Sequence, residues 1–158
     1  MTNTLGVRMQ RFYERLNVDR ERALEELPDL YTDDIAFFCP METRYGLATF
    51  KRSWEFAFAS YKMFEFHDFT LVDGSDNFAL FYTMKVQMRV GRPMETPVGA
   101  LFRVRDGKCH EQIDYWDNVG GVASIWVPAF RGYRWAVSKL LSGGRSVEGT
   151  PGRMDPIR

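Results

Sequence analysis

The stretch FRVRDGKCHEQIDYWD, Phe102–Asp117, decides the fold. Its central Asp-Gly is a strong β-hairpin turn signal, and the flanking residues include the aromatic and β-branched types that favour strands. We therefore expect one strand over 94–105 and a second over 108–117. Alternation along the second strand places four side chains on one face, namely His110, Gln112, Asp114 and Trp116.

Two further strands precede this hairpin. Residues 78–90 alternate clearly in their second half, with Met84 and Val86 on one side and Lys85 on the other. Residues 63–72 alternate more loosely. Because these long strands follow one another with turn signals between them, an antiparallel meander is the simplest sheet.

The first part of the chain has helical periodicity instead. Its apolar spacing predicts a helix over 5–16, a short helix capped by Asp19, and a third helix after Gly46. A brief strand over 35–38 separates the second helix from the third. Aromatic residues form one stripe along the third helix, including Phe50, Trp54 and Phe58.

The end of the chain divides into two parts. Residues 122–141 have apolar residues at helical spacing and predict an amphipathic segment that is kinked or split at Pro128. Residues 143–158 contain four Gly and two Pro with few apolar residues, which predicts a disordered tail. We therefore expect a single domain over 1–142.

Composition excludes several classes of partner. The 21 basic and 21 acidic residues leave a formal net charge of zero, so no strong field would attract nucleic acid or an anionic membrane. No apolar run approaches the length of a membrane span. Cys39 and Cys109 follow no metal or redox spacing, and His67 has no second ligand at useful spacing. These features predict a cytoplasmic protein without a metal or cofactor.

The order of elements resembles the nuclear-transport-factor-like superfamily, and its SnoaL-like domains in particular. LYTDDIAFFCP (30–40) followed by YGLATFKR (45–52) resembles the strand–turn–helix of that superfamily, and 102–117 resembles its last hairpin. The resemblance covers about residues 5–140. It implies an α+β fold in which a cone-shaped, curved antiparallel or mixed sheet wraps around N-terminal helices and a C-terminal helical segment follows. It also implies a pocket between the helices and the sheet.

The best-known chemistry of this superfamily transfers poorly. Its ketosteroid isomerases use an Asp base and an oxyanion hole of Tyr and protonated Asp. The resemblance places the base at Cys39 and the oxyanion Asp at Ala100. It places the Tyr at Phe12, with Tyr13 one residue out of register. Isomerisation by that mechanism is therefore disfavoured.

Two other branches are closer in the last hairpin. Of the five catalytic residues of limonene epoxide hydrolases, this chain retains one, at Asp114. The Arg and second Asp of that set fall on Thr83 and Lys85, so this hydrolysis is also disfavoured. SnoaL-like polyketide cyclases use a single Asp acid/base in a largely apolar pocket, and Asp114 or Asp117 matches that residue.

We predict a site on this basis. If Asp114 faces the pocket as the resemblance implies, alternation brings polar neighbours to the same cavity. The predicted catalytic set is Asp114, Lys85, His110 and Gln112. The predicted substrate-binding set is Phe38, Phe50, Trp54, Phe58, Thr83 and Trp116. Two other readings stay open: Asp114 and Lys85 form a structural ion pair, and the aromatic stripe is ordinary core.

Three functions remain open. The favoured one is a cofactor-independent enzyme that acts on a hydrophobic small molecule by acid/base chemistry, of the cyclase, isomerase or dehydratase type. The second is a non-catalytic protein that binds an apolar ligand. The third is an interaction role for residues 122–141. We also expect a homodimer through the outer sheet face, because the apolar side with Met84, Val86 and Met88 needs cover.

Overall fold

Side-chain caps fix where the first two helices begin. The computed structural model describes residues 4–74, 76–89 and 92–117. In α1, Leu5–Leu16, the Thr4 hydroxyl accepts a hydrogen bond from the Val7 amide at 3.3 Å. In α2, Arg20–Glu25, the Asp19 carboxylate accepts one from the Arg22 amide at 3.1 Å, which confirms the predicted cap.

The next elements lead into the longest helix. α3, Leu27–Leu30, runs directly into β1, Tyr31–Phe38, so the predicted brief strand is the end of a longer one. β2, Thr43–Tyr45, turns back against β1. α4, Leu47–Ser60, follows Gly46, whose φ of 82° lies in the left-handed region that favours glycine.

The last four strands form the predicted meander. They are β3, Tyr61–Val72; β4, Asn77–Met88; β5, Met94–Arg105; and β6, Lys108–Trp116. Asp106 and Gly107 have φ of 53° and 76°, as a type I′ hairpin turn between β5 and β6 requires. The strand order is β2-β1-β6-β5-β4-β3, and β1 pairs in parallel with β6. The predicted α+β fold with a curved mixed sheet is confirmed.

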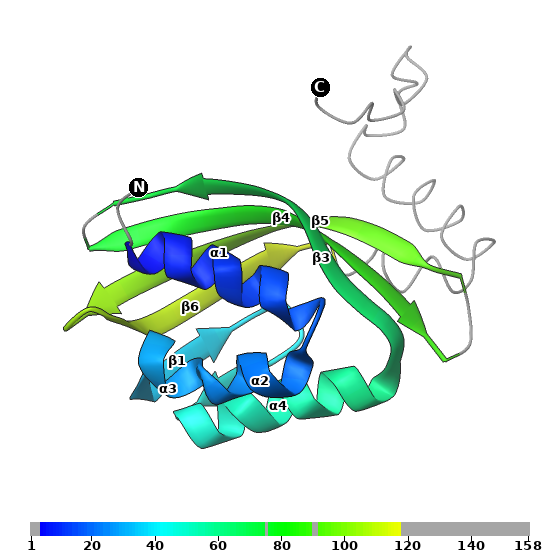
Figure 1. Ribbon diagram of the computed structural model, residues 1–158, viewed down its shortest axis with the longest axis horizontal. Coiled ribbons are helices and arrows are strands. Elements are labelled where there is room, and N and C mark those ends of the chain that lie inside the picture. Colours follow the sequence, from blue (N-terminus) through cyan, green and yellow to red (C-terminus); the bar gives the residue numbers. More distant parts are fainter. Residues whose placement is uncertain (1–3, 75, 90–91, 118–158) are drawn as a thin grey trace, which may run out of the picture. The chain divides into compact units, whose positions relative to one another are not determined.

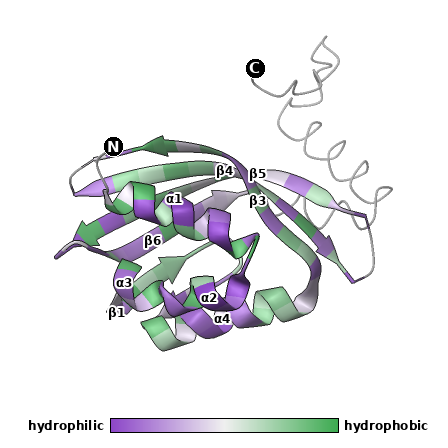
Figure 2. Cartoon of the chain, viewed as in Figure 1, coloured by the Kyte–Doolittle hydropathy of each residue, from purple (hydrophilic) through white to green (hydrophobic). Residues whose placement is uncertain are grey.

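The helices pack on one face of the curved sheet (Figure 1). Hydrophobic and hydrophilic residues alternate along the strands (Figure 2), and the inward set packs against α1 and α4. Met9, Phe12 and Leu16 of α1 are fully buried. The core therefore lies between the concave face of the sheet and the helices.

Two predictions on the end of the chain lie outside the described residues. These are the amphipathic segment over 122–141 and the disordered tail over 143–158, and with them the predicted domain boundary after residue 142. Within the described residues, none of the helices has both the length and the apolar character needed to cross a membrane.

Candidate functional site

A cavity opens between α4 and the inner face of the sheet. Its volume is about 370 Å³. Aromatic side chains dominate its walls: Phe37, Phe50, Trp54, Phe56, Tyr61, Phe64, Phe66, Tyr82 and Trp116. Four methionines add flexible apolar surface: Met41, Met84, Met88 and Met94. We call this space the aromatic cavity. Its size and lining suit an apolar small molecule.

Asp114 is the buried charged side chain in this apolar wall. It is 6% exposed and lines the aromatic cavity from β6. Burial raises the pKa of its carboxyl to about 7, and a hydrogen bond from Gln112 opposes part of that rise. Both the protonated and the ionised forms of this carboxyl are therefore present near neutral pH.

A network of tyrosines surrounds Gln112 behind Asp114. Gln112 is 0% exposed, and its Nε2 donates to Asp114 Oδ1 at 2.8 Å and to the Tyr13 hydroxyl at 3.0 Å. The Tyr31 hydroxyl donates to Gln112 Oε1 at 2.7 Å. Tyr82 hydrogen-bonds to Tyr13 and also lines the cavity. Both N–H groups and the oxygen of the Gln112 amide thus have hydrogen-bond partners, as burial demands.

Burial keeps the three tyrosines neutral. It raises the pKa of Tyr13, Tyr31 and Tyr82 well above the ordinary value, and the nearby Asp114 carboxylate raises each further. Cys39 lines the same cavity, and burial raises the pKa of its thiol too. At neutral pH Asp114 is therefore the group of this cluster that titrates.

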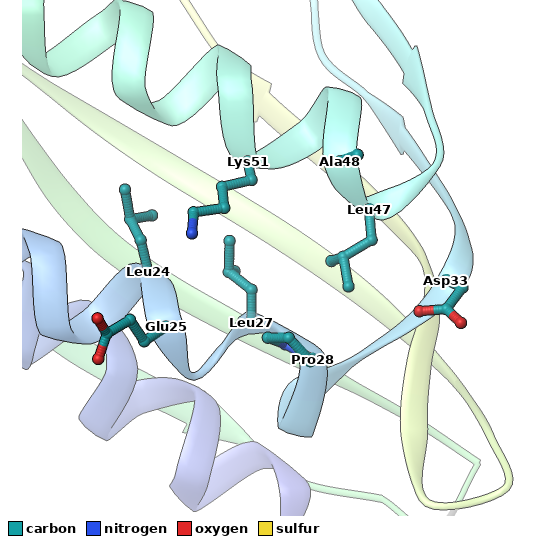
Figure 3. A pocket seen from close by; sticks show the side chains of 8 residues that line it. All are labelled: Leu24, Glu25, Leu27, Pro28, Asp33, Leu47, Ala48 and Lys51. Atoms are coloured by element: carbon teal, nitrogen blue, oxygen red, sulfur yellow. The ribbon is translucent and has the colours of Figure 1, made fainter.

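A second hollow lies between α2 and α4 (Figure 3). This α2–α4 groove has a volume of about 380 Å³ and is lined by Leu24, Glu25, Leu27, Pro28, Asp33, Leu47, Ala48 and Lys51. Its charged side chains are exposed or half-buried. Because no buried polar group reaches it, the groove lacks the chemistry that Asp114 brings to the aromatic cavity.

Comparisons with known proteins agree with this geometry. The family model for the SnoaL-like domain matches residues 9–112. The chain belongs to the SnoaL-like domain family. No curated protein matches it.

Solved structures share the fold at low sequence identity. A candidate polyketide cyclase from Pseudomonas putida is 18% identical with a TM-score of 0.67, over 78% of this chain and 99% of that one. A protein with a ketosteroid isomerase-like fold from Catenulispora acidiphila, in complex with trimethylamine, is 13% identical with a TM-score of 0.66. The match covers 79% of this chain and 94% of that one. A candidate isomerase from Rhodopseudomonas palustris is 20% identical with a TM-score of 0.65. The match covers 78% of this chain and 97% of that one.

Only some of the predicted site residues lie at the aromatic cavity. Asp114, Phe50, Trp54 and Trp116 line it, and Gln112 lies directly behind Asp114. The prediction that Asp114 pairs with Lys85 is wrong. Lys85 forms an ion pair with Glu95 at 3.1 Å instead.

Thr83 and Lys85 were assigned to the wrong face of β4. Tyr82, Met84 and Val86 line the cavity, so the two polar residues between them point to the outer face. The prediction took polar side chains to be the ones facing the site. The apolar face of β4 lines the aromatic cavity instead. Met84, Val86 and Met88 therefore give no reason to expect a dimer.

The prediction that His110 shares the cavity with Asp114 is also wrong. Arg103 pairs with Glu111 but Val104 pairs with Cys109, so His110 is an extra residue that forms a β-bulge. The bulge breaks the alternation, and both Cys109 and Gln112 are buried, three positions apart. His110 does not line the cavity.

Two predicted aromatic contacts do not line the cavity. Phe37, one residue earlier, takes the place assigned to Phe38, whose ring packs against Tyr45 with centroids 6.0 Å apart. Phe58 stacks on Trp54 with centroids 5.6 Å apart and is absent from the lining. Phe58 therefore supports the wall that Trp54 forms.

Sequence reasoning missed the tyrosines. Tyr13, Tyr31 and Tyr82 each fall at an apolar, inward position of a helix or strand. A buried tyrosine hydroxyl usually finds a hydrogen-bond partner, so inward tyrosines are a signal for a buried polar network. Within the described residues no group of His, Cys, Asp and Glu is arranged to hold a metal ion.

Proposed function

We propose that this SnoaL-like domain is a cofactor-independent enzyme that moves a proton on an apolar small molecule, with Asp114 as the acid/base. The supporting observation is the buried carboxyl of Asp114, whose pKa is raised to about 7, in the wall of an aromatic cavity. A group with a pKa near the working pH is the most effective proton carrier, because both of its forms are populated.

The chemistry that suits this site is reversible proton removal from a carbon next to a carbonyl group. The Asp114 carboxylate takes the proton, the carbon–hydrogen bond breaks, and the electron pair moves to the carbonyl oxygen as an enolate. Returning the proton to a different carbon gives an isomerase. Attack of the enolate carbon on a second carbonyl carbon gives a cyclase, and protonated Asp114 then gives its proton to the new alkoxide oxygen. Both reactions use one carboxyl as acid and base.

The comparisons support this proposal at the level of reaction class. One solved relative is described as a candidate polyketide cyclase and another as a candidate isomerase. A third holds trimethylamine, a small organic molecule. The cavity residues of this chain add the acid/base group that such reactions require.

The test measures deuterium uptake at the α-carbon of β-tetralone, an apolar cyclic ketone, in buffered deuterium oxide by NMR. We expect Asp114→Asn, which keeps the shape but cannot take the proton, to lower the catalysed rate by about 100-fold or more. Lys85→Ala on the outer face is the matched control and should keep the wild-type rate. Because proton removal needs the carboxylate, the wild-type rate should rise as pH passes through about 7.

Two outcomes would contradict the proposal. An Asp114→Asn protein that exchanges deuterium as fast as wild type would remove Asp114 from the chemistry. If wild type binds β-tetralone, seen as quenching of Trp54 and Trp116 fluorescence, but no ketone of a compound library undergoes exchange, the domain is a non-catalytic binder of apolar ligands.

We also propose that the outer sheet face binds a second copy of the chain. Phe81 of β4 lies beside Gly99 of β5, which lies beside Tyr115 of β6, and the two rings are 48% and 60% exposed. In the next row Leu101 lies beside Ile113, which in turn lies beside Phe38. Two adjacent apolar rows on an open sheet face favour association with another apolar face.

Sedimentation velocity tests this dimer. We expect a wild-type dimer at micromolar concentration. Phe81→Lys with Tyr115→Lys should give a monomer, because two buried lysines in a symmetric interface leave charges without partners. A wild-type monomer at every concentration would refute the dimer.

A further inference from the structure

The two oxygens of the Asp114 carboxyl have different surroundings. Oδ1 accepts the hydrogen bond from Gln112 Nε2 at 2.8 Å. Oδ2 has no hydrogen-bond partner among the described residues, and it is not one of their fully buried, unpartnered polar atoms. Since Asp114 lines the aromatic cavity, Oδ2 is the oxygen that a ligand can reach.

The Gln112 amide is held from its other sides. The Tyr31 hydroxyl donates to Oε1 at 2.7 Å, and the second Nε2 hydrogen goes to the Tyr13 hydroxyl at 3.0 Å. Turning the amide over would direct Oε1 at Asp114. It would also send the Tyr31 proton to its other neighbour, Met9 Sδ at 3.2 Å, and a thioether is a weak acceptor.

We infer that Gln112 is a positioning residue that confines the acidic proton of Asp114 to Oδ2, at the cavity, by occupying Oδ1 with an N–H donor. The oxygen lone pair that accepts a hydrogen bond from a fixed N–H group cannot also bind the acidic proton. The neutral acid therefore presents its O–H to the cavity, and the carboxylate presents the free oxygen there. The catalytic role of this proton rests on the proposed function, whereas the test of where the proton lies does not.

Five titratable groups lie close enough for the Asp114 carboxylate to raise their pKa. They are Tyr13 from α1, Tyr31 from β1, Tyr82 from β4, Cys39 after β1, and Cys109 on β6. Burial is the main cause of the raised pKa of each, so none of the five competes with Asp114 for the proton at neutral pH. The other charged residues that line the cavity are Glu42, Arg92 and Asp117.

The test uses NMR on the ligand-free protein. The Asp114 carboxyl carbon and the Gln112 side-chain amide should titrate with one midpoint near pH 7. The coupling across the N–H···Oδ1 hydrogen bond should persist on both sides of that midpoint. If it disappears when Asp114 is protonated, the amide turns over, the proton resides on Oδ1, and the inference is wrong.

Gln112→Leu provides the second measurement. It removes the donor that favours the carboxylate, so the Asp114 midpoint should rise by about one pH unit. Tyr82→Phe is the matched control, since it deletes a hydroxyl of the same cluster that hydrogen-bonds to Tyr13. The Asp114 midpoint in this variant should stay near that of wild type. An unchanged midpoint in Gln112→Leu would overturn the inference. Should Gln112→Leu fail to fold, the wild-type titration alone decides.

This result is separable from the proposed function. The titration and the coupling need no substrate, so a protein without catalytic activity still answers the question of where the proton lies. Conversely, loss of deuterium exchange in Asp114→Asn leaves the role of Gln112 undecided. If both proposals hold, the Gln112→Leu protein should also need a higher pH for half-maximal exchange, by about the same one unit.

Discussion

α4 separates two hollows of nearly equal volume, about 370 Å³ for the aromatic cavity and about 380 Å³ for the α2–α4 groove. The cavity has a buried carboxyl backed by an amide and three tyrosines. The groove has leucines, a proline and solvent-exposed charges. The two hollows thus differ in chemistry and not in volume. The candidate site is the one with a polar group taken out of water and held by fixed partners.

Both hollows take their walls from the same helix. Phe50, Trp54 and Ala57 face the cavity, at the three- and four-residue spacing that repeats one face of a helix. Ala48 and Lys51 face the groove from another side of α4. Matched substitutions on α4 can therefore alter one hollow at a time.

The largest expected effect concerns the buried carboxyl that distinguishes the cavity. An unfolded chain releases the Asp114 proton near pH 3.9, whereas the folded chain holds it to about pH 7, so wild type loses stability as pH rises through this window. Asp114→Asn has no such loss. Between about pH 5 and pH 8 the difference between the free energy of unfolding of Asp114→Asn and that of wild type should increase, in favour of the variant, by up to about 3 kcal/mol. Urea unfolding of both proteins measures this, and a gap that does not widen with pH would contradict the raised pKa.

A smaller effect should follow from filling each hollow in turn. Ala57→Phe places a ring in the aromatic cavity and should weaken β-tetralone binding at least about 10-fold, since overpacking and lost space cost on the order of 1–3 kcal/mol. Ala48→Phe places the same ring on the groove side of α4 and should bind as wild type does. Tryptophan fluorescence titration measures both, with circular dichroism to show that each variant is folded. Equal weakening in the two variants would mean that the ligand does not distinguish the hollows.

The smallest effect is expected at the groove itself. Lys51→Ala removes the cation at its centre, and a change at a solvent-accessible site of this kind alters stability by about 0.5 kcal/mol or less. Deuterium exchange of β-tetralone should keep its wild-type rate. A clear loss of exchange in Lys51→Ala would show that the groove takes part in function and would break the comparison.

The elements of this fold were predictable because local signals determine them. Asp19 caps a helix, and Asp106-Gly107 adopts the two left-handed conformations of a hairpin turn. Which face of β4 is buried was not predictable in the same way. Alternation shows that Tyr82 and Thr83 lie on opposite faces of the sheet but not which of them is inside. The expectation that polar side chains face a catalytic site selected the wrong face.

The candidate site was harder to predict than the fold. Asp114 was found through the last hairpin, but its partners come from α1, β1 and β6, far apart in the sequence. The packing of α1 against the sheet and the pairing of β1 with β6 bring them together. One such consequence is that Ala100, where the resemblance seats an oxyanion carboxyl, lies directly across from Asp114. In this chain the carboxyl at this level of the sheet lies on β6 and not on β5.

The extra residue at His110 also has a consequence for how this sequence can change. From the hairpin turn to Asp114, alternation is interrupted once, so the tip of the hairpin and the cavity end of β6 follow separate phases. Without His110, Val104 would still pair with Cys109 and Arg103 with Glu111, and no extra residue would stand between the two pairs. Regular alternation would then keep Cys109, Gln112 and Asp114 on one face of β6. Related sequences should therefore tolerate the loss of this one residue, whereas deletion of a residue between Gln112 and Asp114 would turn Asp114 to the outer face.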